Sequence, residues 1–183
     1  MARVPYLDKH DLPPEYQELL NRSINVTRAL VHSPKAARKF GALGNYIRHG
    51  STLDSRLSEI AIIQVGYLTR SPYEYSHHVK IGMDMGVSAG DIRAIAAETA
   101  GKPSSLDALS SAVIRAAREM TTDLTISDAT FALLLDELGT ERLIDLILAI
   151  ATYNGVVRIL GALQIDVEAD YLTYLEQFPL PTA

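Results

Sequence analysis

Apolar residues recur along most of this chain at the three- and four-residue spacings of amphipathic helices. In the segment 54–68, for example, Ile60, Ile63 and Tyr67 fall on one helical face. No run of alternating apolar and polar residues, the pattern of a half-buried strand, persists anywhere in the sequence. The pattern therefore predicts an all-α fold.

Capping residues and glycines divide this pattern into separate helices. Ser33 followed by Pro34 is typical of a helix start, and Ser88 with Asp91 has the form of a capping box. Gly139 is typical of a helix end. The predicted helices cover 12–22, 33–48, 54–68, 71–85, 88–98, 105–121, 127–139 and 140–163, and a short helix follows near 169.

The predicted helix 140–163 is apolar on nearly all of its sides. Such a helix must be enclosed by other helices or by a second subunit, so we expect a homo-oligomer. Its most apolar part, 143–151, contains Asp145 and is too short to span a bilayer. We expect no membrane partner, and one domain over residues 1–183 with an N-terminal arm (1–32) and a C-terminal arm (165–183).

A weak internal echo links two of these helices. The segment 56–60 (RLSEI) resembles 142–146 (RLIDL), and Tyr67 then matches Tyr153 in the same register. A match this short has two alternative explanations, chance similarity and duplication of a helical unit.

Composition narrows the classes of function. The 183 residues carry a net charge of -5, which argues against a nucleic-acid partner. The chain has no cysteine, which excludes disulfides, thiolate catalysis and zinc–thiolate sites and suits a cytoplasmic location. Residues 1–14 contain no apolar run of the kind found in signal peptides.

The segment 71–78 (SPYEYSHH) holds the most informative chemistry. Glu74 and His78 are four residues apart, so a helix that begins at Pro72 places both on one face. A paired carboxylate and imidazole can transfer protons. However, Glu74 also completes a capping box with Ser71, in which it would bond to the backbone and do no chemistry. The sequence leaves both interpretations open.

Neighbouring residues leave further alternatives. Glu59 is favoured near a helix start by the helix dipole, or it is buried beside His78, in which case Arg56 or His78 must pair with it. His77 lies about 100° around the helix from His78 and is expected to be exposed or at a subunit contact. A metal site of Glu59, Glu74 and His78 is the weaker alternative, because no second ligand pair exists.

Motif order and spacing carry a family resemblance. The segments 56–63, 71–78 and 86–92 resemble the carboxymuconolactone decarboxylase family, which includes alkyl hydroperoxidase D-like proteins. The similarity extends from about 33 to 97, and more weakly from 105 to 162. It implies an all-α, alkyl hydroperoxidase D-like helical bundle and ring-like homo-oligomers, commonly trimers or hexamers.

The resemblance also assigns positions in the motif. The peroxidase branch has a Cys-x-x-Cys pair at the start of this helix, a histidine four residues later and an acid on the preceding helix. His78 and Glu59 stand at the histidine and acid positions, whereas Ser71 and Glu74 stand where the cysteines would be. Peroxide reduction needs a thiolate, so thiol peroxidase activity is not expected of this cysteine-free chain.

Together these features predict a lyase-like enzyme without cofactor or metal. The expected reaction is decarboxylation, or a related proton transfer, on a small organic acid or lactone. The alternative is a non-catalytic helical oligomer or small-ligand-binding protein. The expected catalytic residues are His78, Glu74 and Glu59, and the expected substrate-binding residues are Tyr73, Tyr75 and Arg56, with Arg48 as the alternative arginine for a substrate carboxylate.

Overall fold

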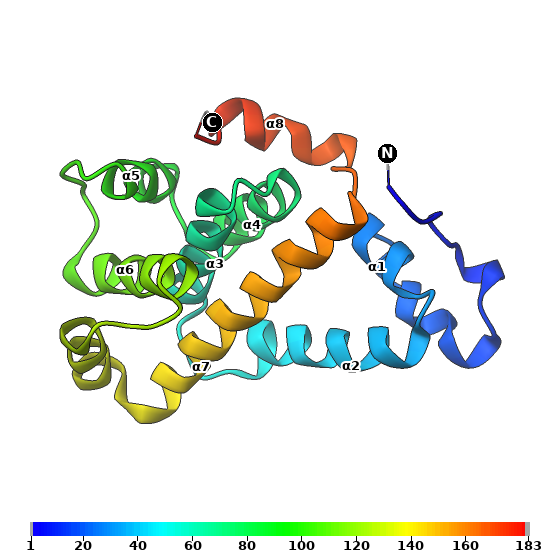
Figure 1. Ribbon diagram of the computed structural model, residues 1–183, viewed down its shortest axis with the longest axis horizontal. Coiled ribbons are helices and arrows are strands. Elements are labelled where there is room, and N and C mark those ends of the chain that lie inside the picture. The colour runs from blue at the N-terminus through cyan, green and yellow to red at the C-terminus, as the bar shows by residue number, and fades with distance from the viewer. Residues whose placement is uncertain (1, 182–183) are drawn as a thin grey trace.

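Helices and short helical turns make up the fold in the computed structural model, which describes residues 2–181 (Figure 1). The α-helices are α1 (Asn25–Leu30), α2 (Pro34–Asn45), α3 (Ser55–Leu68), α4 (Pro72–Asp84), α5 (Ala89–Thr99), α6 (Ala108–Thr122), α7 (Asp128–Leu163) and α8 (Ala169–Gln177). The turns are η1 (Lys9–Asp11), η2 (Pro14–Leu20) and η3 (Tyr46–Gly50). No strand occurs among residues 2–181, so the all-α prediction is confirmed. The outermost residues of the two predicted arms, 1 and 182–183, lie outside the described residues.

Helix α3 forms the centre of the core. Every residue from Leu57 to Gly66 is buried, because α4, α5, α6 and α7 surround this helix. Ile60, Ile62 and Ile63 are completely inaccessible to solvent. The burial of α3 on all of its sides therefore follows from its central position rather than from a single contact face.

Glycines let α3 and α4 approach closely. A Cβ atom on Gly66 of α3 would lie 3.0 Å from the backbone nitrogen of Tyr75 on α4. A Cβ atom on Gly82 of α4 would lie 3.0 Å from Ile63 and 3.4 Å from the Cβ atom of Glu59. These spacings leave no room for a methyl group, so the two glycines hold the side chains of α3 within reach of those of α4.

The predicted helix ends agree with the structure where capping residues mark them. Ser88 and Asp91 form the expected capping box, with hydrogen bonds of 3.0 and 2.8 Å. Gly86 and Gly139 both adopt positive φ, 93° and 74°, and each ends a helical run. The prediction was wrong at the N-terminus, where 12–22 holds the 3-10 turn η2 and the short α1 was missed.

Helix α7 is long and apolar enough to cross a membrane by length and composition alone. Gly139 interrupts it, and 39% of its most apolar window is buried against the rest of the protein. Asp145 in this helix accepts hydrogen bonds from Tyr46 (2.9 Å) and Ser51 (2.6 Å). These features match the core helix of a soluble helical domain. Asp145 and Glu59, which the internal echo aligns, are both buried acids, but the duplication itself stays a prediction.

The N-terminal segment lies beside the end of α7 (Figure 1). The backbone N–H of Arg3 donates to the carbonyl of Leu163 (2.8 Å), and Tyr6 donates to Asp166 (3.0 Å). From there α8 lies across α4. The two arms are therefore docked on the bundle and on each other.

Candidate active site

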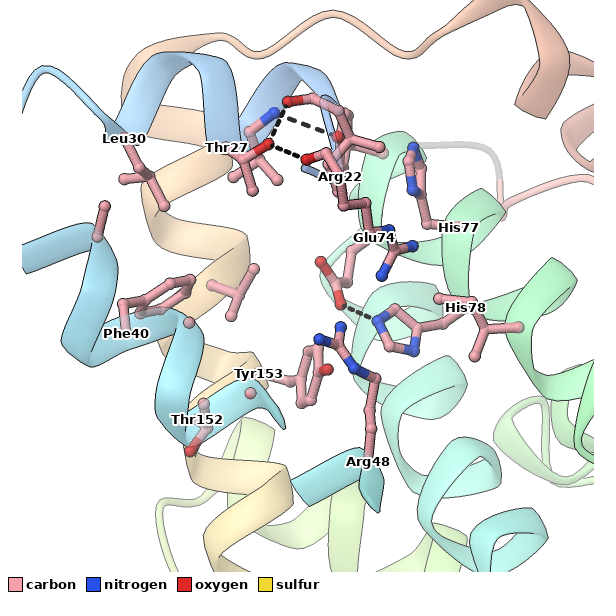
Figure 2. Close-up of a pocket in the computed structure, with 18 of the residues that line it drawn as sticks. Arg22, Thr27, Leu30, Phe40, Arg48, Glu74, His77, His78, Thr152 and Tyr153 are labelled. Atoms are coloured by element: carbon pink, nitrogen blue, oxygen red, sulfur yellow. Dashed lines mark hydrogen bonds and ion pairs between the residues drawn. The ribbon is translucent and has the colours of Figure 1, made fainter. Parts of the chain in front are cut away.

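A cavity of about 220 Å³ separates the N-terminal helices from α4 and α7 (Figure 2). Its two ends differ in chemistry. The polar end holds Arg22, Arg48, Glu74, His78 and Tyr153, and Leu30 and Phe40 lie toward the other, apolar end (Figure 2). The lining also includes Leu19, Ile24, Val26 and Val31. Cavities that combine apolar walls with a few convergent polar groups are the usual sites for small molecules.

Three predicted residues meet at the polar end. Nδ1 of His78 lies 2.7 Å from Oε2 of Glu59, which comes from the preceding helix α3. On the other side of the ring, Nε2 of His78 lies 3.1 Å from Oε1 of Glu74. This second contact is an ion pair whose direction is poor for a hydrogen bond, since that oxygen has no hydrogen-bond partner among the described residues. The imidazole thus connects a deep carboxylate to one that lines the cavity.

Burial and charge together set the state of this histidine. The side chains of Glu59, Glu74 and His78 are at most 6% exposed. Burial alone would disfavour the charged imidazole, but the charges of Glu59, Tyr153 and Glu74 outweigh it and raise the pKa of His78 well above its ordinary value. His78 is therefore a protonated imidazolium at neutral pH, held between two carboxylates.

Glu74 is not a helix cap. No capping interaction joins it to Ser71, whose backbone N–H instead donates to the carbonyl of Gly66 at 3.1 Å. Pro72, at the first helical position of α4, starts the helix without a side-chain cap. The capping-box interpretation is therefore wrong, and the carboxylate of Glu74 is free to face the cavity (Figure 2).

Two arginines and a tyrosine complete the polar end. Figure 2 shows Arg22 and Arg48 reaching toward the pair formed by Glu74 and His78 from opposite sides of it. The ring of Tyr153, on α7, meets the edge of the His78 ring with 4.7 Å between centroids. Burial raises the pKa of Tyr153, so its hydroxyl stays protonated at neutral pH. Arg48, the alternative arginine expected to bind a substrate carboxylate, lines the cavity.

Two expected substrate-binding residues lie elsewhere. Arg56 contacts both carboxylate oxygens of Asp91 (2.8 and 3.3 Å) and the hydroxyl of Ser110, outside the cavity. Tyr75 is 1% exposed and packs in the core against Tyr67, 5.8 Å between ring centroids. The geometry does not support substrate binding by either residue, because the guanidinium of Arg56 ties α3 to α5 and α6 and the ring of Tyr75 faces away from the cavity.

Tyr73 does line the cavity, but its hydroxyl is already engaged. It donates to Glu168 (3.0 Å) and accepts from the backbone N–H of Val26 (3.3 Å). Tyr73 therefore joins α4 to α1 and to the start of α8, and shapes the wall rather than offering a free donor.

His77 was predicted to be exposed or at a subunit contact, and within this chain it is buried at 3% exposure. Its ring stacks between Tyr73 (4.1 Å) and Tyr171 (3.5 Å), and Nε2 contacts Glu168 at 2.8 Å. Glu168 also accepts the backbone N–H of Asn25 at 2.7 Å. The prediction failed because Glu168 and Tyr171 come from α8, far away in the sequence.

Acidification is expected to loosen α8. Burial lowers the pKa of His77, so its undocked form takes up a proton first and stability falls as the pH drops below about 6.5. The pKa of Glu168 is also lowered, since bonds from Asn25 and His77 outweigh its burial, and that contribution is lost as the pH falls further. Amide hydrogen exchange in α8, corrected for intrinsic rates, should be faster at about pH 5 than at about pH 7. Equal protection at both values would contradict this interpretation.

The geometry argues against the metal alternative. Both ring nitrogens of His78 face carboxylates, so neither is open to a metal ion. Among residues 2–181, no group of three or more histidine, aspartate or glutamate side chains is placed to hold a metal.

Sequence reasoning missed three residues of the site. Tyr153 was noticed only through the internal echo, Glu168 carried no signal, and Arg22 was placed at the end of the predicted helix 12–22 without a functional role. Each reaches the site from a part of the chain distant from α4. Only Tyr153 left a trace in the sequence that could have been followed.

The chain is similar to one protein family and to solved structures of other proteins. The profile of the carboxymuconolactone decarboxylase family matches residues 34–113. None of the curated proteins matches the sequence. A solved structure described as an alkylhydroperoxidase AhpD core, an uncharacterized peroxidase-related protein from Ralstonia eutropha JMP134, is 16% identical with a TM-score of 0.79, over 98% of each chain. An uncharacterized peroxidase-related protein from Silicibacter sp. TM1040 is 20% identical with a TM-score of 0.76, over 92% of each chain.

Proposed function

We propose that this protein, whose segment 34–113 belongs to the carboxymuconolactone decarboxylase family, is a cofactor-independent acid–base catalyst acting on a small organic acid or lactone. The observation that carries the proposal is the buried series of Glu59, His78 and Glu74, which ends at a cavity. The absence of cysteine fits a lack of thiol peroxidase activity.

Each member of the series has a separate role. Glu59 accepts from Nδ1 of His78, which fixes the ring orientation and stabilises the imidazolium. His78 stores the proton, and Glu74 passes it between Nε2 and a substrate in the cavity. Groups held rigidly by burial in this way need little reorganisation during proton transfer.

Decarboxylation with protonation at carbon suits this arrangement. The bond between the carboxylate and the neighbouring carbon breaks, and carbon dioxide leaves. The electron pair moves into an adjacent carbonyl of the substrate as an enolate, and carbon then takes up the proton that His78 supplies through Glu74. Arg22 and Arg48 offset negative charge on the substrate at this end of the cavity.

The test is deuterium incorporation at carbon and release of carbon dioxide, measured by NMR and gas analysis on a panel of small 3-oxo acids and carboxylated lactones in D₂O. Wild-type protein is expected to accelerate both for at least one member of the panel. Failure of every member to react faster than in buffer would contradict the proposal and favour a non-catalytic, ligand-binding protein.

The variant Glu74→Gln is expected to slow that reaction by up to about 10²-fold. Its amide cannot pass a proton, although water in the cavity still reaches Nε2 of His78. The exchange rate is compared with that of Glu141→Gln, a change at an exposed acid of α7 that lies outside the cavity. An unchanged rate in Glu74→Gln would remove Glu74 from the mechanism.

A further inference from the structure

Helix α2 turns one of its faces toward the cavity. None of the residues of α2 is buried, and the helix packs mainly on its chain neighbours η2, α1 and η3. Ala37, Phe40, Gly41 and Gly44 line the cavity. The inner face of α2 therefore lines the cavity, whereas most amphipathic helices pack their apolar face against the rest of the protein.

Two glycines enlarge this volume. A Cβ atom built on Gly41 or Gly44 would meet nothing within 4 Å. Glycine inside a helix is unfavourable relative to alanine, so local helix stability does not account for either residue. Both positions instead leave space at the cavity wall that α2 forms.

The polar end carries the opposite property, a net positive charge. Arg22, Arg48 and the imidazolium of His78 oppose the carboxylates of Glu59 and Glu74. No ion pair or hydrogen bond engages either guanidinium among residues 2–181, whereas those of Arg56 and Arg38 are paired. An anionic group at this end can accept hydrogen bonds from two planar guanidinium groups that no other described side chain engages.

We infer that the ligand is a monocarboxylate with an aliphatic tail, its carboxylate between Arg22 and Arg48 and its tail along the α2 face at Phe40 and Gly44. The inference rests on the proposed function, because it specifies the substrate class of the same site. A dicarboxylate of equal length fits less well, since its second charge would be buried among the side chains of Leu30, Val31 and Phe40. The cavity is smaller than those that hold drug-sized ligands, which limits the tail to a short chain.

Titration calorimetry with saturated n-alkanoates, from butanoate to dodecanoate, tests this on the full chain. The dissociation constant is expected to fall about fourfold for each added methylene until the cavity is filled, and to change little beyond that length. Octanoate should bind more tightly than its dicarboxylate counterpart suberate and than 1-octanol. Tighter binding of suberate, or affinity independent of chain length, would overturn the inference.

Variants locate the two ends of the ligand. In Gly44→Leu the dissociation constant should stop falling at a shorter chain length, because the new side chain fills part of the space for the tail. The matched change Ala36→Leu, on the exposed face of α2, should leave that chain length unchanged. Arg48→Met should weaken binding about tenfold or more at every chain length. If Gly44→Leu and wild-type profiles coincide, the tail does not lie on α2.

These measurements separate the inference from the proposed function. Saturated alkanoates lack the carbonyl that decarboxylation needs, so binding is recorded without any reaction. Chain-length-dependent binding in a protein that fails to exchange deuterium would keep the ligand class and reject the catalysis. Exchange on 3-oxo acids without binding of the alkanoates would do the reverse.

Discussion

Replacing His78 with alanine is expected to lower the rate of deuterium incorporation and carbon dioxide release by about 10²–10⁴-fold. The imidazole contacts Glu59 through Nδ1 and Glu74 through Nε2, so its loss interrupts the series at its centre. The rate is compared with that of His49→Ala, which removes an exposed imidazole at the end of η3.

A second variant keeps this prediction informative if His78→Ala folds poorly. The side chain of His78→Gln can hydrogen-bond with Glu59 and Glu74 but cannot store a proton. It should therefore fold like wild type and still lose the reaction. Wild-type rates in His78→Gln would show that the imidazole takes no part in catalysis.

The raised pKa of His78 also predicts the pH profile. A step that uses the imidazolium proceeds below this pKa and slows as the pH rises through it. Glu59→Gln removes the charge that favours the imidazolium, so the alkaline decline should move to lower pH. A purely structural role of Glu59 would lower the rate without moving the profile.

Replacing Glu59 with alanine is expected to reduce the free energy of unfolding by about 3–5 kcal/mol. The change leaves the imidazole of His78 buried beside a space where its 2.7 Å partner had been. Urea denaturation monitored by circular dichroism measures the loss.

A double-mutant cycle identifies the cause of that loss. If the two groups stabilise each other, the combined variant of Glu59→Ala and His78→Ala should cost less than the sum of the single changes, because neither partner remains unpaired. Additive costs would show that cavity formation alone explains the destabilisation.

The same pair predicts a pH dependence of stability. The folded pKa of His78 lies above its unfolded value, so the stabilisation is complete below about pH 6.5 and is lost as the pH rises through the folded pKa. Glu59→Ala should remove this dependence. The sign is opposite to that expected for α8, where acid weakens the contacts of His77.

Local chemistry allowed most helices to be predicted from the sequence. The capping box at Ser88 and the glycines at 86 and 139 act within a few residues of themselves, so their effect can be read without the fold. Helix α1 has only six residues, too few to show a period, and was missed for that reason.

The candidate site was predictable only in part. The spacing of Glu74 and His78 and the resemblance that pointed to Glu59 indicated residues that the structure brings together. The same local pattern also allowed a capping box, and only the bond from Ser71 to Gly66 decides between the two. Arg56 looked suitable because of its position near Glu59, but its partners on α5 and α6 carry no signal in the sequence.

The carboxylate of Glu168 has a consequence for the order in which the chain becomes functional. It joins residues made 143, 95 and 91 positions earlier, at Asn25, Tyr73 and His77. During synthesis the contacts between α3 and α4 can form as soon as both helices have left the ribosome, because they are close in the sequence. The bonds that Glu168 adds between the N-terminal wall and α4 form only after almost the whole chain has been translated. A nascent chain that stops before Glu168 therefore contains every residue of the proton-transfer series and still lacks the carboxylate that joins Asn25, Tyr73 and His77.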